Sequence, residues 1–191
     1  ARIFKNFGTS SSSKLILNWM MRAETEKQKE LIKGLFRGDG NYYKKQHKSG
    51  LKKVFKINTT SYTLARQVRD ILLRLGVGSF LNKRDSVKEG RQAMYTIGVS
   101  GEYMIPFGEI VGIPVAKNIH SHKRATMFYA DNKYAYFPIK EIKKSAVKNR
   151  EVFNFAVEGD ESYTAYGIAV HNCSAPIYAT SSLHAAVVEI I

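Results

Sequence analysis

Apolar residues in this chain switch between helical and strand spacing in a fixed order along residues 26–111. Helical spacing predicts one helix over 26–37 and a second over Leu64–Leu75, which Gly76 ends. Strands are predicted over 40–46, 52–58, 79–84 and 92–100, and a closing helix over 103–111. The order α-ββ-α-ββ-α predicts an α+β domain in which helices cover one sheet face and the other is available to a ligand.

The charge of the chain is strongly positive and unevenly distributed. There are 30 Lys+Arg residues against 16 Asp+Glu residues, a formal net charge of +14. No acidic residue lies between Gly40 and Asp70. Unbalanced positive charge repels itself unless phosphates neutralise it, so we predict DNA or RNA as the partner. The alternative is a hairpin that lysine keeps soluble.

The first two predicted strands form a ribbon around a turn at His47–Gly50. Lys44 and Gln46 share a face of the first strand, and Lys52, Lys56 and Asn58 share a face of the second, although Val54 interrupts the alternation. A two-stranded ribbon fits the DNA major groove, where such side chains read base edges. We expect DNA contacts from Lys44, Gln46, Lys52, Lys56, Asn58, Lys83 and Arg91.

The end of the first predicted helix, Leu31–Gly40, has an unusual composition. Gly34 and Gly38 each lower helix stability by about 1 kcal/mol relative to Ala. Glycine at both positions is explained if the backbone of another helix approaches that face. Asp39 lies where the helix dipole disfavours a carboxylate, unless a divalent cation reverses the local charge. The alternative is a left-handed exit at Gly40, with Asp39 an indifferent turn residue.

Leu31–Gly40 resembles the LAGLIDADG motif of homing endonucleases in its GLFxxDG form, and the α-ββ-α-ββ-α order is similar to one repeat of that family. The resemblance implies that Asp39 is catalytic and binds Mg²⁺ beside the matching aspartate of a second motif. It also implies that the sheet forms a saddle on DNA and that two metal ions assist phosphodiester hydrolysis.

The segment Phe7–Lys14 resembles Ile110–Lys117, with a glycine shortly before each lysine. In two-repeat members of the family a basic residue closes each repeat near the scissile phosphate, which implies catalytic roles for Lys14 and Lys117. Both could instead be exposed loop charges. If Lys14 ends a first repeat, the paired-carboxylate site needs a segment upstream of Ala1 or a second copy of the chain.

The C-terminal third predicts a separate β module, with strands over 136–142, 151–158, 162–165 and 168–170 and a turn at 159–161. The module ends in His171-Asn172-Cys173. This tripeptide and the stretch Glu151–Gly167 resemble the C-terminal splicing blocks of inteins, whose β domain is of the Hint type. The resemblance implies protein splicing, for which no cofactor is needed.

The residue types in the tripeptide suit this reaction. The side-chain amide nitrogen of Asn172 can attack its own backbone carbonyl, closing a succinimide and breaking the bond to Cys173. His171 can polarise that carbonyl or protonate the leaving amine, and the Cys173 thiolate can accept the N-extein acyl group. Many inteins have Asp where Asn154 stands and His near Glu161, which leaves open whether Glu161 or Asp160 supplies the missing group.

These features predict the C-terminal part of an endonuclease-containing intein. The expected division is a first-repeat tail (1–16), an endonuclease repeat (17–130), a Hint-type segment (131–172) and a C-extein stub (173–191). Expected partners are double-stranded DNA, a missing N-terminal intein and endonuclease segment, and the host extein protein. No apolar run approaches the roughly 18 residues of a membrane span, so we expect a cytoplasmic protein with no membrane partner.

Two alternatives remain for the endonuclease-like region. It could be a stand-alone homing endonuclease that acts as a homodimer, which leaves His171-Asn172-Cys173 unexplained, or a non-catalytic DNA-binding module with the same fold. An internal disulfide framework and a cysteine-rich zinc site are excluded because the chain has one cysteine. His120-Ser121-His122 is interpreted as a loop, since no third ligand lies nearby in the sequence.

Overall fold

The chain divides into two compact units, Ala1–Pro138 and Ile139–Ile191. The structure is a computed structural model, and it describes residues 5–47, 50–85, 92–115, 129–130, 135–137, 143–146, 157, 159, 162–165, 168–171 and 184–187. Within these residues the helices fall in the first unit, the second contains strands, and no helix is long and apolar enough to cross a bilayer.

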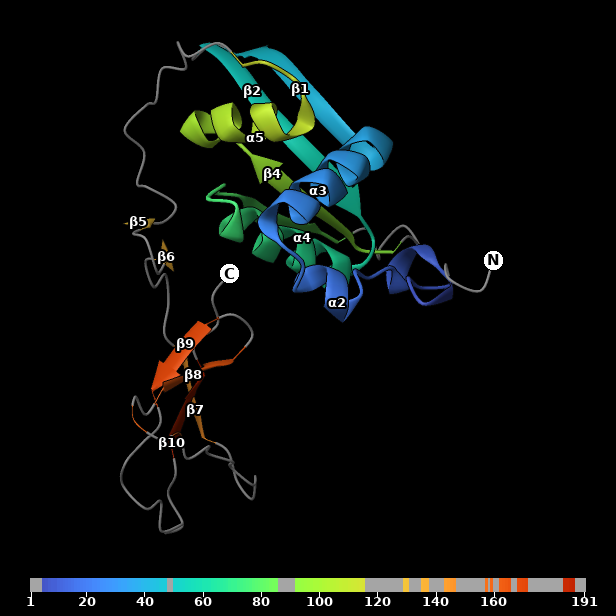
Figure 1. Cartoon of the computed structure of the whole chain (residues 1–191). Helices are drawn as coiled ribbons and strands as arrows, with labels where there is room; N and C mark the ends of the chain where they lie inside the picture. The colour runs from blue at the N-terminus through green and yellow to red at the C-terminus, as the bar shows by residue number, and fades with distance from the viewer. Residues whose placement is uncertain are drawn as a thin grey trace. The chain divides into compact units, whose positions relative to one another are not determined.

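The first unit confirms the predicted order of elements (Figure 1). A 3-10 turn, η1 (Ser11–Ser13), and a short helix, α2 (Asn18–Met21), precede the repeat. The repeat consists of α3 (Thr25–Asp39), β1 (Gly40–His47), β2 (Gly50–Thr59), α4 (Tyr62–Arg74), β3 (Phe80–Arg84), β4 (Met94–Val99), η3 (Gly101–Tyr103) and α5 (Met104–Val111). The short strands β5 (Tyr129–Ala130) and β6 (Ala135–Tyr136) pair with each other.

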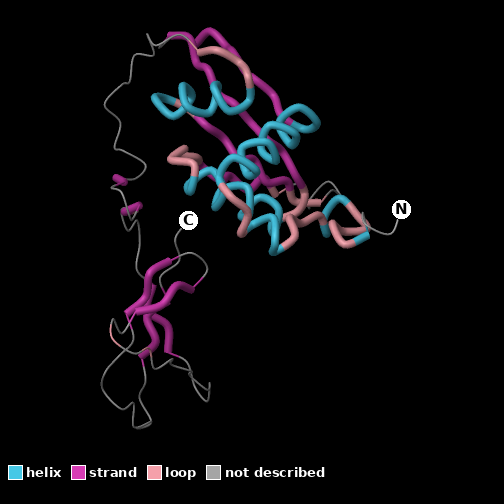
Figure 2. Tube along the Cα trace, viewed as in Figure 1, coloured by secondary structure: helices cyan, strands magenta, loops and turns pink. Residues whose placement is uncertain are grey.

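The four strands of the repeat form one antiparallel sheet in the order β1-β2-β4-β3. Helices α3, α4 and α5 lie on one side of this sheet (Figure 2). Their apolar side chains, including Ile32, Val68 and Met104, bury against Phe55, Ile57 and Ile97 of the central strands. The helices therefore cover one face, as the element order predicts.

An aromatic cluster joins α3, α5 and the sheet. The Phe36 ring lies 5.5 Å from the rings of both Phe55 and Phe107, edge to face, and Phe55 and Phe107 lie 5.1 Å apart. Tyr42 stacks on Phe55 at 4.5 Å. Full burial of each phenylalanine contributes about 1.5–3 kcal/mol, so this cluster fixes the last turn of α3 against the first strand pair.

The passage from α3 to β1 takes place without a loop. Asp39 is the last helical residue and Gly40 is the first strand residue, with φ −86° and ψ 154°. The left-handed exit considered from the sequence is therefore wrong. Glycine is needed at this position because a Cβ on Gly40 would overlap the ring and the carbonyl of Phe36.

The second unit contains two strand pairs. Strand β8 (Ser162–Ala165) pairs with β9 (Ile168–His171), which confirms the strands predicted at 162–165 and 168–170, and Gly159 lies in a turn with φ +88°. Strand β7 (Lys143–Ala146) pairs with β10 (His184–Val187), so residues expected to be host sequence add a strand to this unit.

Two other predicted strands lie largely outside the described residues. For the strand at 136–142, Tyr136 closes β6 and Phe137 has no regular structure, while 138–142 lie outside the described residues. The strand predicted at 151–158 lies outside them except for Val157, which has no regular structure.

The Phe36–Gly40 contact predicts opposite effects for two glycine substitutions. In Gly40→Ala the methyl group meets Phe36, so we expect the free energy of unfolding to fall by about 1–3 kcal/mol. In Gly38→Ala the methyl group enters open space on a helix, so the free energy of unfolding should rise by about 0.5–1 kcal/mol. Urea denaturation of both variants measures this, and effects of the same sign would contradict the packing described.

Candidate active site and nucleic-acid interface

Asp39 ends α3 with its carboxylate exposed. The buried stripe of α3 is formed by Gln28, Ile32 and Phe36, and Asp39 lies beyond it at the start of the sheet. The helix dipole is negative at this end, which disfavours a carboxylate unless a cation lies close by. The position therefore favours a nearby positive charge.

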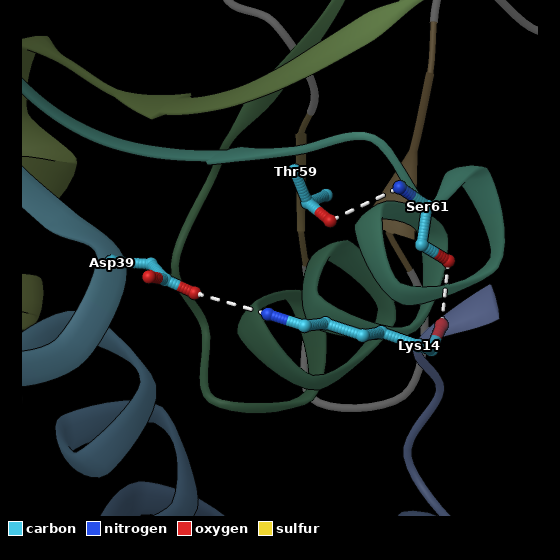
Figure 3. A network of polar contacts seen from close by, with 4 residues as sticks. All are labelled: Lys14, Asp39, Thr59 and Ser61. Atoms are coloured by element: carbon cyan, nitrogen blue, oxygen red, sulfur yellow. Dashed lines mark hydrogen bonds and ion pairs between the residues drawn. The ribbon is translucent and has the colours of Figure 1, made fainter. Parts of the chain in front are cut away.

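Lys14 supplies such a charge. Its Nζ lies 3.9 Å from Asp39 Oδ2, so the structure brings together two residues for which the sequence predicts catalytic roles (Figure 3). The two side chains are 51% and 59% exposed. An ion pair this exposed contributes about 0–1 kcal/mol, so its importance lies in placing an ammonium and a carboxylate together, not in stability.

The backbone of Lys14 is held by residues at the start of α4. Ser61 Oγ donates a hydrogen bond to the Lys14 carbonyl oxygen at 2.5 Å and accepts one from the Leu64 N–H at 3.1 Å. The Ser61 N–H in turn donates to Thr59 Oγ1 at 3.1 Å (Figure 3). A polar network thus runs from the end of β2 through the cap of α4 to Lys14 and Asp39.

The two similar segments around Lys14 and Lys117 share a backbone feature. Gly8 has φ +104° and Gly112 has φ +75°, a conformation that favours glycine over other residues. Gly112 ends α5, and Gly8 follows a turn. Lys117 itself lies outside the described residues, so its catalytic role stays a prediction.

The register of the β1–β2 hairpin decides which predicted DNA contacts share a face. Asn41 lies opposite Lys56, Tyr43 opposite Val54 and Lys45 opposite Lys52. All six side chains belong to the face opposite Tyr42 and Phe55, and therefore opposite the helices. We call this the open face.

Lys44 and Gln46 belong to the other face of the ribbon. Lys44 lies opposite Lys53, and Gln46 lies opposite Leu51. The Lys44 ammonium lies 4.7 Å from the Tyr42 ring, whereas the Lys56 ammonium lies 4.5 Å from the Tyr43 ring, so each lysine contacts an aromatic ring on its own face. Of the residues predicted on the ribbon, Lys52, Lys56 and Asn58 are therefore placed together, while Lys44 and Gln46 are separated from them.

Sequence reasoning missed several side chains of the open face. Asn41, Tyr43 and Lys45 lie on β1, and Asn82, Arg84 and Thr96 lie on β3 and β4. The hairpin offered a usable signal for the first three. Counting outward from the His47–Gly50 pair places Lys45 opposite Lys52, which assigns odd positions of β1 to the face of Lys52.

A neutral polar row crosses the open face between the charged residues. Asn58 lies opposite Thr96, which lies opposite Asn82. Thr96 Oγ1 lies 2.7 Å from Asn58 Oδ1 and donates to it. This bond engages the amide oxygen and leaves the amide N–H groups of Asn58 as donors. Neutral amides read base edges, whereas lysine and arginine contact both phosphates and base edges.

The other two predicted DNA contacts are not placed with this row. Lys83 shares the strand face of Leu81, and its ammonium lies 3.1 Å from Asp85 Oδ2. The hydrogen bond to Asp85 raises the pKa of Lys83, so its charge is already engaged with a carboxylate. Arg91 lies outside the described residues.

The predicted Mg²⁺ needs more ligands than this site provides. Mg²⁺ is held by several oxygen atoms in octahedral geometry. Among the described residues, no group of three or more His, Cys, Asp and Glu side chains is placed to hold a metal ion. Asp39 is one exposed carboxylate with an ammonium 3.9 Å away, so the described residues do not by themselves fit the cation.

Comparison with known proteins shows what the repeat that contains Asp39 is similar to. Residues 26–112 match the sequence model of the LAGLIDADG-like domain. The match runs from α3 through α5 and includes Asp39 and the whole four-stranded sheet. Residues 26–112 are therefore similar to a LAGLIDADG-like domain, in agreement with the resemblance of Leu31–Gly40.

Curated relatives extend the similarity beyond this domain. The chain is 35% identical over 97% of its length to an iron-sulfur cluster assembly SufBD family protein of Mycobacterium tuberculosis, of which it spans 20%. It is 30% identical over 91% of its length to an uncharacterised protein of Methanocaldococcus jannaschii, again spanning 20%. It is 28% identical over 74% of its length to an ATP-dependent DNA helicase of Thermococcus kodakarensis, spanning 12%.

The division of lysines between two faces predicts different effects on DNA binding. In Lys52→Gln, on the open face, we expect weaker binding and a slope of log K against log[salt] that is shallower by about 0.9, because one phosphate contact is lost. In the matched variant Lys44→Gln the slope should not change. Fluorescence anisotropy with duplex DNA at several salt concentrations measures both. Equal slopes in the two variants would contradict the assignment of faces.

Proposed function

We propose that residues 26–112 form one half of a site-specific DNA endonuclease of the homing type. The open face binds duplex DNA, and the Asp39–Lys14 pair lies at the scissile phosphate. The observation that carries this proposal is the 3.9 Å approach of Lys14 to Asp39, at the end of the helix that bears the LAGLIDADG-like motif. The basic open face beside that helix end supports it.

The two side chains have separate roles in the proposed reaction. Water attacks the phosphorus atom of the backbone and one P–O ester bond breaks. Negative charge develops on the phosphoryl oxygens, and the Lys14 ammonium stabilises it. Asp39 supplies carboxylate oxygens on the same side of the phosphate.

A complete site requires a second carboxylate beside Asp39. The glycines on one face of α3 leave space for a second helix, which would carry that carboxylate. No atom of the described residues lies within 4 Å of a Cβ built on Gly34 or Gly38. We propose that the matching helix packs there, from another part of the gene's polypeptide or from a second copy of the chain. The two aspartates would then share the divalent cation, Mg²⁺.

Replacing Asp39 tests this proposal. In Asp39→Asn we expect double-strand cleavage to fall by about a hundredfold or more, because the carboxylate is lost at the reacting centre. DNA affinity should be retained, since the open face is unaltered. The measurement is sequencing of cut ends from a randomised duplex library, incubated with Mg²⁺ and the complete polypeptide encoded by the gene.

The outcomes separate the alternatives. Cleavage that survives Asp39→Asn would contradict a catalytic Asp39. Binding without cleavage by the wild type would favour a non-catalytic DNA-binding module. Cleavage by this chain alone, with a dimer in sedimentation, would favour a homodimeric endonuclease.

We also propose that the chain takes part in protein splicing of the intein type. Two relatives with similar sequence have unrelated names, one an iron-sulfur cluster assembly protein and the other a DNA helicase. The chain spans 20% of the first and 12% of the second. A shared segment in such different proteins supports an inserted module that is independent of the host's activity. His171-Asn172-Cys173 at the end of a β run supports the same reading.

The described part of the second unit supports this second proposal only up to His171. Strand β9 ends at His171, which pairs with Ser162 of β8. Asn172 and Cys173 lie outside the described residues, so the attack of the Asn172 amide on its own carbonyl rests on residue chemistry. The Hint-type fold of residues 131–172 and the C-extein assignment of 173–191 are likewise proposals.

Replacing Asn172 tests the splicing proposal. In Asn172→Ala the amide nucleophile is removed, so we expect no release of the segment that begins at Cys173. Mass spectrometry of the complete polypeptide with its flanking host sequence measures this release. Asn82→Ala, on the open face of the other unit, is the matched control and should release normally. Release from the Asn172 variant would contradict the proposal.

A further inference from the structure

We propose that Gln67 of α4 and Ser61, the N-cap residue of α4, act as a clamp on the backbone of residues 14–16. This clamp positions the Lys14 ammonium beside Asp39. Gln67 and Ser61 are therefore positioning residues that act through Lys14. The inference rests on the proposed function only for what Lys14 does to DNA. The placement of Lys14 can be tested without DNA.

We call residues 14–17 the strap. The side-chain amide of Gln67 makes two hydrogen bonds to one residue of it. Its Oε1 accepts from the Ile16 N–H at 2.7 Å, and its Nε2 donates to the Ile16 carbonyl oxygen at 2.7 Å. The Ile16 side chain is 4% exposed and packs in the core. A side-chain amide thus pairs with a backbone amide, as a neighbouring strand would.

Ser61 holds the strap two residues earlier. It is 0% exposed, and its hydroxyl donates to the Lys14 carbonyl while accepting from the Leu64 N–H. The same hydroxyl therefore caps α4 and fixes the backbone of the residue that faces Asp39.

The strap needs these partners because it has no regular structure of its own. Residues 14–17 belong to no helix or strand, and the Leu15 N–H donates to the Phe7 carbonyl oxygen at 3.0 Å. The Lys14–Asp39 pair is half-exposed and too weak to hold a chain segment. The backbone contacts to α4 therefore supply the placement, and the lysine side chain is left to act on what lies in front of it.

A second pair of contacts holds the C-terminal end of α2 (Asn18–Met21), which follows the strap. The Met21 carbonyl oxygen accepts hydrogen bonds from Gln28 Nε2 at 2.8 Å and from Arg74 Nη1. Because this end is held separately, loss of the Gln67 contacts should loosen residues 14–16 and leave the rest of the unit folded. This separation makes the inference testable by substitution.

Zero-length crosslinking with a water-soluble carbodiimide tests the placement directly, because it joins carboxylates only to amines in contact. The full wild-type chain should give an isopeptide between Lys14 and Asp39, detected by mass spectrometry. In Gln67→Met, which keeps the length but loses both hydrogen bonds, we expect its yield to fall by about fivefold or more. The exposed Gln92→Met is the matched control and should give the wild-type yield.

An internal standard in the same chain separates loosening from unfolding. Lys29 Nζ lies 2.6 Å from Glu26 Oε1, and both residues belong to α3 and not to the strap. Its crosslink should be unchanged in Gln67→Met. A Lys14–Asp39 yield that stays at the wild-type level in Gln67→Met would overturn the clamp.

Cleavage by the complete polypeptide supplies a readout that a merely structural role would not give. If Gln67 acts through Lys14, Gln67→Met lowers kcat with little change in KM for DNA, and it lowers kcat by less than about twofold when added to Lys14→Met. Equal losses in both backgrounds would overturn the inference. If Gln67→Met loses the Lys14–Asp39 crosslink but the wild-type polypeptide does not cleave DNA, the clamp is supported and the proposed function is contradicted. Failure of the clamp and failure of the proposed function can therefore be distinguished.

Discussion

The close packing of Phe36 against Gly40 is the contact on which the site depends. It lets α3 pass into β1 without a loop, so that Asp39 lies at the junction of helix and sheet. Phe55 and Phe107 hold Phe36 from the sheet and from α5. The carboxylate is therefore fixed by the core beneath it, although its own side chain is exposed.

Charge is distributed so that each group of the site faces an opposite charge or open solvent. The carboxylate of Asp39 is disfavoured by the helix dipole and favoured by Lys14. The open face carries lysines around a neutral polar row, and the nearby lysine that has a carboxylate partner, Lys83, belongs to the other strand face. An exposed ion pair is readily exchanged for contacts to phosphate, which is what a DNA-facing lysine requires.

The order of elements and the position of Asp39 could be predicted because both depend on local spacing and on one helix end. The faces of Lys44 and Lys52 could not be assigned from alternation alone, because Val54 is buried on the open face and disturbs the pattern. The contact of Lys14 with Asp39 was not predicted, because the family resemblance implied only that each residue has a catalytic role. Gln67 left no signal, because it recognises a backbone and not a side chain.

Tethered cleavage tests most directly whether Asp39 lies at the scissile phosphate. An iron chelate attached to Asp39→Cys, in a chain with Cys173→Ser, generates hydroxyl radicals at that position on bound DNA. The account predicts strand breaks centred on the base steps that the native protein cuts. Breaks centred elsewhere in the bound site, or spread evenly along it, would contradict the account.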